Sequence, residues 1–216
     1  MDHFDFSSFK APFINFDTIR KKADEFREKY WVNKNIPVDI FHILEFELKL
    51  EIRPLLGLKR TGDIDSFLLG DFSGIVVDEE EYMDDRYLNR IRYSVAHEIG
   101  HLVLHKNVYD SFKLKFEVEW IELIQNLPEN EYTWLEQHAY EFAGRLLVPF
   151  DELKKEFNKY DSEILEIKKM LIDIEDIIIA ERIAPKICNK FEVSASVITK
   201  RILNENLLEK YKRTTS

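Results

Sequence analysis

The chain contains 216 residues with a formal net charge of −10, and 45% of its residues are hydrophobic and 33% charged. This length is sufficient for a buried core without cross-links, and six glycines and six prolines are too few for a disordered or collagen-like protein. The single cysteine, Cys188, excludes an internal disulfide framework and a cysteine-rich zinc finger. Any metal must therefore be held by histidines and carboxylates.

The charge is unevenly distributed along the chain. Residues 1–150 contain 18 Lys/Arg and 28 Asp/Glu, residues 151–181 contain 5 and 10, and residues 182–216 contain 8 and 3, which gives −10, −5 and +5. Because an acidic body repels polyanions, nucleic-acid binding is expected at most for the basic tail. The sequence shows no signal peptide and no run that could span a bilayer, which predicts a cytoplasmic protein without membrane contact.

The first half of the chain mixes helical and strand patterns. Residues 16–31 are predicted to form an amphipathic helix, and a second helix is expected to begin near Pro37. The acidic run 78–85 is expected to be a solvated loop. Short strands are predicted at 50–56, 66–69 and 74–78.

The second half is predicted to be helical. One helix is expected at about 84–105, another at 116–125, and a third from Pro128 to about Leu147, where Pro149 ends it. Shorter helices follow. The sequence therefore indicates an α+β fold, mostly helical with a small sheet, with one domain over 1–150 and a C-terminal helical segment over 151–216 packed on it.

The segment with the clearest chemistry is an HExxH pattern on the predicted helix 84–105. Two imidazoles four residues apart lie on adjacent turns of one helix face, so His97 and His101 can bind one Zn²⁺. Glu98 then stands close enough to accept a proton from a water at the metal, as a general base. This pattern predicts a zinc site with an open coordination position.

A catalytic site needs a third protein ligand. The extended motif HExxHxxGxxH fails, because Leu104 and Asn107 occupy the positions of its glycine and third histidine. A carboxylate from the helix 128–147 is the alternative, and Glu136 is the best candidate because it shares a face with small residues that permit close helix packing. Three other glutamates remain open as ligands: Glu129, Glu131 and Glu141.

Three further residues near the motif have competing interpretations. His105 continues the face of His97 and His101, but a histidine interacting with the helix C-terminus is the commoner explanation. His138 is expected beside the Glu136 face rather than on it. Tyr140 could donate a hydroxyl to an oxyanion, although aromatic packing is the favoured role.

The motifs together resemble the ImmA/IrrE family of metallopeptidases. The segment 92–105 (RYSVAHEIGHLVLH) resembles the core motif of that family, 74–78 (GIVVD) its preceding strand, and 136–149 (EQHAYEFAGRLLVP) its second motif. The segment 183–202 is similar to the helical region that commonly follows. One departure is Tyr140, where the family usually has asparagine, so this position inherits no role.

The resemblance implies a zincin-like metallopeptidase that binds Zn²⁺ through His97, His101 and Glu136, with Glu98 as the catalytic base. Members of the family act in bacteria and mobile elements, and some cleave a helix-turn-helix repressor. The expected function is therefore a zinc-dependent endopeptidase whose protein substrate is a repressor of this kind. The alternative is a catalytically silent, metal-bound module that binds a repressor or DNA without proteolysis.

Two further expectations concern binding partners. Residues 181–203 are predicted to form two helices around a turn at 191–194, with Ser194 as N-cap, an arrangement compatible with a helix-turn-helix. Lys200 and Arg201 on the second helix could contact DNA, but the acidic body opposes it and the expected role is a packed helical cap. The strand 74–78 is expected at a sheet edge, where an extended substrate could add as a further strand.

Overall fold

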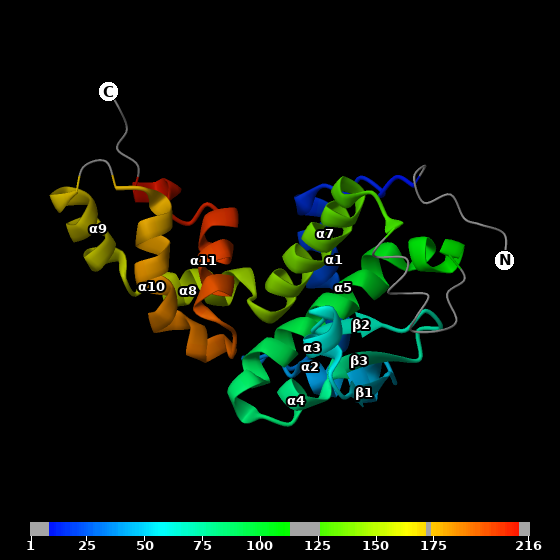
Figure 1. The fold of residues 1–216 in the computed structure, drawn as a ribbon. Coiled ribbons are helices and arrows are strands. Elements are labelled where there is room, and N and C mark those ends of the chain that lie inside the picture. The colour runs from blue at the N-terminus through cyan, green and yellow to red at the C-terminus, as the bar shows by residue number, and fades with distance from the viewer. Residues whose placement is uncertain (1–8, 113–125, 172–173, 212–216) are drawn as a thin grey trace. The chain divides into compact units, whose positions relative to one another are not determined.

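The computed structural model of the protein describes residues 9–112, 126–171 and 174–211. Helices predominate and the strands form a three-stranded sheet, which confirms the α+β class (Figure 1). The chain divides into two compact units, one of Met1–Lys34 and Asp39–Leu146, the other of Asn35–Val38 and Leu147–Ser216. The expected helix at 116–125 lies outside the described residues. In the described ranges, no helix has the length and apolar character needed to cross a membrane.

Three helices form the body of the first unit, α1 (Phe16–Tyr30), α5 (Leu88–Phe112) and α7 (Glu129–Leu147). Phe26 of α1 packs edge-on against Phe142 of α7, with ring centroids 5.7 Å apart. Burying an aromatic side chain of this kind contributes roughly 1.5–3 kcal/mol. The predicted helices 16–31 and 128–147 are thereby confirmed, whereas α5 continues well beyond the predicted end at 105.

Helices α5 and α7 approach closely where both carry small residues. A Cβ atom at Gly100 of α5 would lie 3.2 Å from both the Cα and the carbonyl oxygen of Ala139 on α7. Ala143, one turn further along α7, is also fully buried. Small side chains at these positions let the two backbones come together, which confirms the expectation drawn from the face that Glu136 shares with the alanines.

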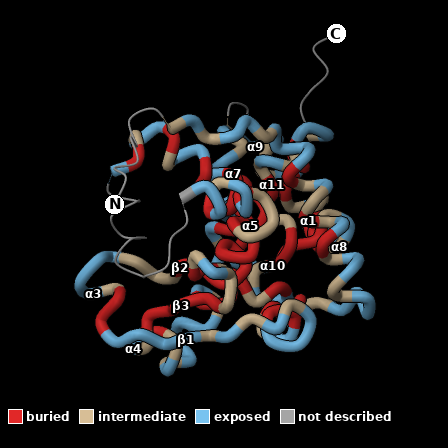
Figure 2. Tube along the Cα trace, turned by 90° about the vertical axis from the view of Figure 1, so that its right-hand side faces the viewer, coloured by how far each residue is buried: buried red, intermediate tan, exposed pale blue. Residues whose placement is uncertain are grey.

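The sheet has the strand order β1-β3-β2, formed by β1 (Glu51–Leu55), β3 (Gly74–Asp78) and β2 (Ser66–Leu68). β3 pairs with β1 in parallel and with β2 in antiparallel register, and it is buried along its whole length while β1 is largely exposed (Figure 2). The expectation that 74–78 lies at a sheet edge was therefore wrong. Both sides of β3 are occupied, and β2 is the edge strand that lies against α5.

Short helices precede the first strand of the first unit and connect it to the second. Helix α2 (Ile40–His42) begins at Asp39, whose side chain accepts a hydrogen bond from the backbone N–H of His42, and it continues as a π-helical turn over Ile43–Glu47. The predicted helix near Pro37 is therefore present but begins slightly later. Helix α3 (Leu58–Gly62), between β1 and β2, was not expected from the sequence.

The acidic run 78–85 forms helices rather than the solvated loop that was expected. Asp78 is buried, and its carboxylate accepts hydrogen bonds from the backbone N–H groups of Lys59 (2.8 Å) and Glu81 (3.0 Å). The second of these caps the N-terminus of α4 (Glu79–Tyr82), and a 3-10 turn (Asp85–Tyr87) leads into α5. Carboxylates at helix starts satisfy otherwise unpaired N–H groups, which explains why the acidic residues stabilise helix here.

The second unit is built from helices. The turn between its last two helices matches the prediction, since the Ser194 side chain accepts a hydrogen bond from the backbone N–H of Val197. Arg201 is buried and forms an ion pair with Glu205, so of the two cations considered as DNA contacts, Lys200 alone is exposed. The helices are α8 (Phe150–Asn158), α9 (Asp161–Met170), α10 (Asp176–Phe191) and α11 (Ala195–Asn204).

Candidate metal centre

The two histidines of the HExxH pattern point their Nε2 atoms at the same spot. They lie one helical turn apart on α5, and the Nε2 atoms of His97 and His101 are 3.0 Å from each other. Both side chains are buried, and their rings meet edge to face. The helical spacing alone produces this geometry, because residues i and i+4 project from the same face.

Glu136 on α7 completes the cluster from the opposite side. Its carboxylate oxygens lie 3.1 Å from Nε2 of His97 and 3.2 Å from Nε2 of His101. Glu136 lies one turn before Ala139, the residue of α7 that approaches Gly100 of α5 closely. The structure thus brings together the three residues that the sequence singled out as metal ligands.

The other candidate glutamates of α7 lie elsewhere. Glu131 pairs with Lys10 at 2.9 Å, and Glu141 pairs with Arg20 of α1 at 2.6 Å. Glu129 is exposed at the first residue of the helix. These ion pairs fix the two buried carboxylates on other faces of α7, so Glu136 is the member of the helix that reaches the histidines.

The chemistry of these donors fits a divalent transition metal. Two imidazole nitrogens and a carboxylate oxygen within 4.8 Å of one another form a set that suits a catalytic zinc site. Burial alone would lower the pKa of His97, but the adjacent Glu136 carboxylate outweighs it and raises the pKa. Burial would likewise raise the pKa of Glu136, whereas hydrogen bonds from His101 and His97 lower it. The histidine–carboxylate pairing that a metal would replace therefore stabilises a charged glutamate.

Glu98 is held beside the cluster by the edge strand. One carboxylate oxygen accepts a hydrogen bond from the Ser66 hydroxyl at 2.8 Å, and the other accepts one from the backbone N–H of Leu68 at 2.9 Å. A carboxylate has about four lone-pair sites, so both oxygens retain the capacity to accept a further proton or hydrogen bond. The position of Glu98 is therefore fixed by β2 without blocking its use as a base.

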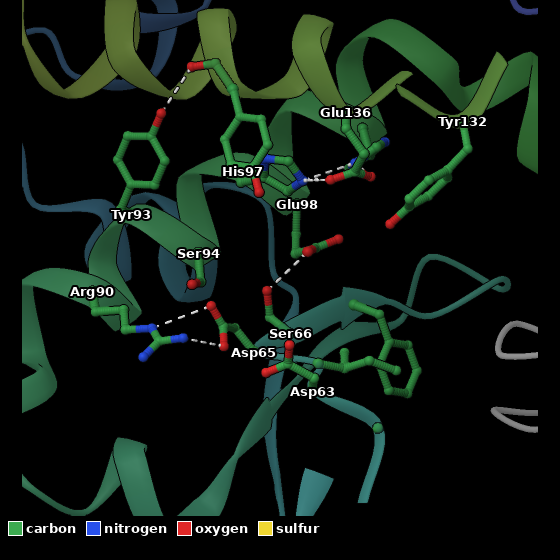
Figure 3. A pocket seen from close by; sticks show the side chains of 15 residues that line it. Asp63, Asp65, Ser66, Arg90, Tyr93, Ser94, His97, Glu98, Tyr132 and Glu136 are labelled. Carbon is green, nitrogen blue, oxygen red and sulfur yellow. Dashed lines mark hydrogen bonds and ion pairs between the residues drawn. The ribbon is translucent and has the colours of Figure 1, made fainter. Parts of the chain in front are cut away.

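One cavity of about 370 Å³ is lined by the three candidate ligands and the candidate base, His97, His101, Glu136 and Glu98 (Figure 3). Its lower wall carries Asp65, which pairs with Arg90 of α5 at 2.6 Å and with Lys59 at 2.7 Å. Burial alone would raise the pKa of Asp65, but the hydrogen bonds from these two cations outweigh it and lower the pKa. The cavity wall therefore contains an ionised carboxylate whose charge is balanced by two cations.

Tyr132 is a cavity residue that the sequence analysis missed. Its ring packs against Leu127 and Leu135, while its hydroxyl points into the cavity near Glu136 (Figure 3). Burial, followed by the negative charges of Glu136 and Glu98, raises its pKa, so the phenol stays protonated at neutral pH. Its position four residues before Glu136 on the same helix face was the available signal.

Tyr140 also lines the cavity and packs against a candidate ligand. Its ring centroid lies 4.4 Å from that of His97. The ring also stacks on that of Tyr93, with centroids 6.2 Å apart. The ring thus makes aromatic packing contacts of the favoured kind at the wall of the cavity.

Two further histidines lie close to the site, and the sequence placed the first of them, His105, incorrectly. His105 lies well inside α5 rather than at its C-terminus, is fully buried, and has its Nδ1 atom 3.1 Å from Nδ1 of His101. His138 of α7 approaches it from the other side, with its Nδ1 atom 3.2 Å from Nε2 of His105. Burial, then the neighbouring imidazoles, lowers the pKa of His105 to about 2, so its ring is neutral.

The comparisons with known proteins agree with this site. The peptidase M78 family model, described as an IrrE N-terminal-like domain, matches residues 85–203, which is more than half of the chain. The matched segment contains the HExxH helix and the glutamate-bearing α7. No curated protein and no solved structure matches the chain. The chain therefore belongs to the ImmA/IrrE family of metallopeptidases.

Proposed function

We propose that this protein is a zinc-dependent endopeptidase. In this proposal His97, His101 and Glu136 hold Zn²⁺, and Glu98 is the general base. The observation that carries it is the convergence of two imidazoles and a carboxylate on one point of an open cavity that Glu98 also lines. Membership of a metallopeptidase family supports the same chemistry.

The catalytic step divides between the ion and the protein. Zinc held by His97, His101 and Glu136 would supply a Lewis acid that polarises the peptide carbonyl and acidifies a water molecule. Glu98 accepts a proton as the water oxygen bonds to the carbonyl carbon, and it returns that proton to the amine nitrogen as the carbon–nitrogen bond breaks. The hydrogen bonds from Ser66 and Leu68 keep the carboxylate oriented for both transfers.

Tyr132 is the residue best placed to stabilise charge on the attacked carbonyl oxygen. Its hydroxyl points into the cavity beside Glu136, and its raised pKa keeps it a hydrogen-bond donor. A preorganised donor aimed at a developing oxyanion contributes about 10²–10³-fold to kcat. Tyr132 is therefore proposed as the hydrogen-bond donor to the oxyanion, a role that the sequence had suggested for Tyr140.

The substrate binds along β2 in extended form. In its antiparallel pairing with β3, the backbone groups of Asp65, Phe67 and Leu69 face β3, so those of Ser66 and Leu68 face away from it. Leu68 donates to Glu98, which leaves the backbone of Ser66 at the cavity wall to pair with a peptide. Strand addition at this edge aligns a peptide bond with the candidate metal site.

The proposed substrate is a helix-turn-helix repressor, as some members of the family cleave. The charge of residues 1–150, −10, favours association with a basic DNA-binding protein and disfavours direct binding to DNA. DNA contact by the C-terminal helices is correspondingly not proposed, since Arg201 is committed to an ion pair with Glu205. Retention of the protein on DNA at low salt would contradict this view.

The decisive experiment compares zinc-loaded wild-type protein with Glu98→Gln. The probes are a repressor encoded beside the gene and a peptide library, with fragments identified by mass spectrometry. We expect the wild type to cleave and the variant to bind stoichiometric zinc without cleaving. Glu25→Gln, on the exposed face of α1, is the matched control and should cleave like the wild type.

Each outcome of this comparison is informative. Cleavage by Glu98→Gln at the wild-type rate would overturn the proposed base. Tight binding of the repressor by zinc-loaded wild type, with no cleavage of any probe, would replace the endopeptidase by the non-catalytic binding module.

A further inference from the structure

A chain of three imidazoles runs from the candidate metal site into the interior of the first unit. Nδ1 of His101 lies 3.1 Å from Nδ1 of His105, and Nε2 of His105 lies 3.2 Å from Nδ1 of His138. All three side chains are buried. The chain joins α5 to α7, the two helices that carry the candidate ligands.

Metal binding would determine which ring nitrogen carries the proton in each of the three imidazoles. If His101 binds the ion through Nε2, its proton is on Nδ1 and must be donated to Nδ1 of His105. His105 then carries its own proton on Nε2 and donates it to Nδ1 of His138. The buried position of His105 is compatible with this neutral ring, because a charged imidazole there would lack solvation.

The two histidine ligands are supported differently. Nδ1 of His97 has no hydrogen-bond partner among the residues that the structure describes, and its ring is held by packing against Tyr140 at 4.4 Å. His101, by contrast, is fixed through a polar contact to a second imidazole. Metal-binding histidines usually donate their outer N–H to a carboxylate, carbonyl or water, and that partner sets the tautomer and the ring orientation.

We propose that His105 and His138 are positioning residues that act in series to hold His101 in its metal-binding tautomer and orientation. This inference rests on the zinc ligands proposed above, but it assigns a role to two residues outside that set. His105 acts directly on His101. His138 acts only through His105, because it contacts the chain at the far end.

The first test uses a nearly isosteric pair of substitutions at position 105 and measures Zn²⁺ affinity by competition with a chromophoric chelator. Asparagine can place its amide oxygen near the position of the imidazole Nδ1, whereas leucine has the same shape without an acceptor. We expect His105→Leu to weaken zinc binding by about 10–100-fold and His105→Asn to restore most of that loss. Equal affinity of the two variants would overturn the proposal. His42→Gln, an exposed histidine on α2, is the control.

The serial arrangement predicts non-additive effects. His138→Leu alone should weaken zinc binding several-fold, and it should have no further effect in the His105→Leu background. Independent, additive losses would show that His138 acts by another route and would overturn the serial chain. Circular dichroism of each variant verifies that the fold is retained.

A measurement on the wild type does not depend on the variants folding. In the ¹⁵N spectrum of zinc-loaded protein, we expect His105 and His138 to carry their protons on Nε2 and His101 to carry its proton on Nδ1. A proton on Nδ1 of His105 would refute the proposal. Failure of the wild type to bind zinc would remove the metal site and this inference together. Normal zinc binding without any effect at position 105 would remove the inference alone.

Discussion

Gly100 is predicted to control both the stability of the first unit and its affinity for zinc. An added Cβ atom in Gly100→Ala would lie 3.2 Å from the Cα and carbonyl oxygen of Ala139, and 3.3 Å from Cδ1 of Phe142. The optimal separation of such atoms is about 3.5–4.0 Å, so α7 must move away by about 0.3 Å or more. Two of the three contacts are backbone atoms of a helix, which cannot rotate aside.

The magnitude follows from two opposing effects. Overpacking of this kind costs about 1–3 kcal/mol, while replacing glycine by alanine inside a helix contributes about 1 kcal/mol. We expect a net loss of about 1 kcal/mol in the free energy of unfolding. Glu136 lies one turn from Ala139 and moves with it, and metal–ligand distances tolerate only about 0.2 Å. Zinc affinity should therefore fall about tenfold.

The assay combines urea unfolding of the metal-free protein with zinc competition against a chelator. The control is Gly62→Ala on α3, where the three atoms nearest to the added methyl group all belong to the side chain of Ile64. This control also replaces a helical glycine by alanine, but its nearest neighbours lie outside α5 and α7, so zinc affinity should be unchanged. If Gly100→Ala is as stable as the wild type and binds zinc equally well, the close crossing of α5 and α7 does not position Glu136.

Three further predictions test the surroundings of the site. Ser66→Ala removes one of the two donors to Glu98, so kcat should fall about tenfold with little change in KM or zinc content, as steady-state kinetics and metal analysis would show. Gly74→Ala would place Cβ 2.5 Å from a carbonyl oxygen of β1, so urea unfolding should show a loss of about 2 kcal/mol or more, and a loss under about 0.5 kcal/mol would contradict the pairing. Burial alone would raise the pKa of Asp65, but its ion pairs lower it, so its contribution to stability is present above about pH 4 and is lost as the pH falls through its folded-state pKa. The stability difference between wild type and Asp65→Asn, measured by urea unfolding, should therefore shrink between pH 5 and 2, and a difference independent of pH would refute this.

The sequence predicted the features that depend on neighbours along the chain. The paired histidines follow from i and i+4 spacing on a helix, and the extent of α7 follows from the prolines that flank it. The N-cap at Ser194 likewise follows from the preference of serine for that position. In each case the determining interaction spans only a few residues, so it can be seen in one sequence.

The sequence predicted one contact between distant segments, that of Glu136 with His97 and His101, and missed the others. It favoured Glu136 over other glutamates of α7, but only the ion pairs of Glu131 and Glu141 show where those carboxylates go. It wrongly placed the strand 74–78 at a sheet edge. The order in which strands pair depends on distant segments, so the local pattern could not reveal it. In the acidic run 78–85, the cap from Asp78 to Glu81 is a local interaction, but the second partner of the buried Asp78 carboxylate is the backbone of α3.

The sequence by itself therefore determined the α+β class and the HExxH helix with its two imidazoles, because strand and helix patterns are local properties, and its motifs carried the resemblance to the ImmA/IrrE family. The tertiary structure decided how β2 anchors Glu98, how Tyr132 enters the cavity, and how His105 and His138 come to lie behind His101. Those contacts depend on the crossing of α5 and α7 and on the strand order of the sheet. Both arise from packing between segments far apart in the chain, which no local pattern encodes.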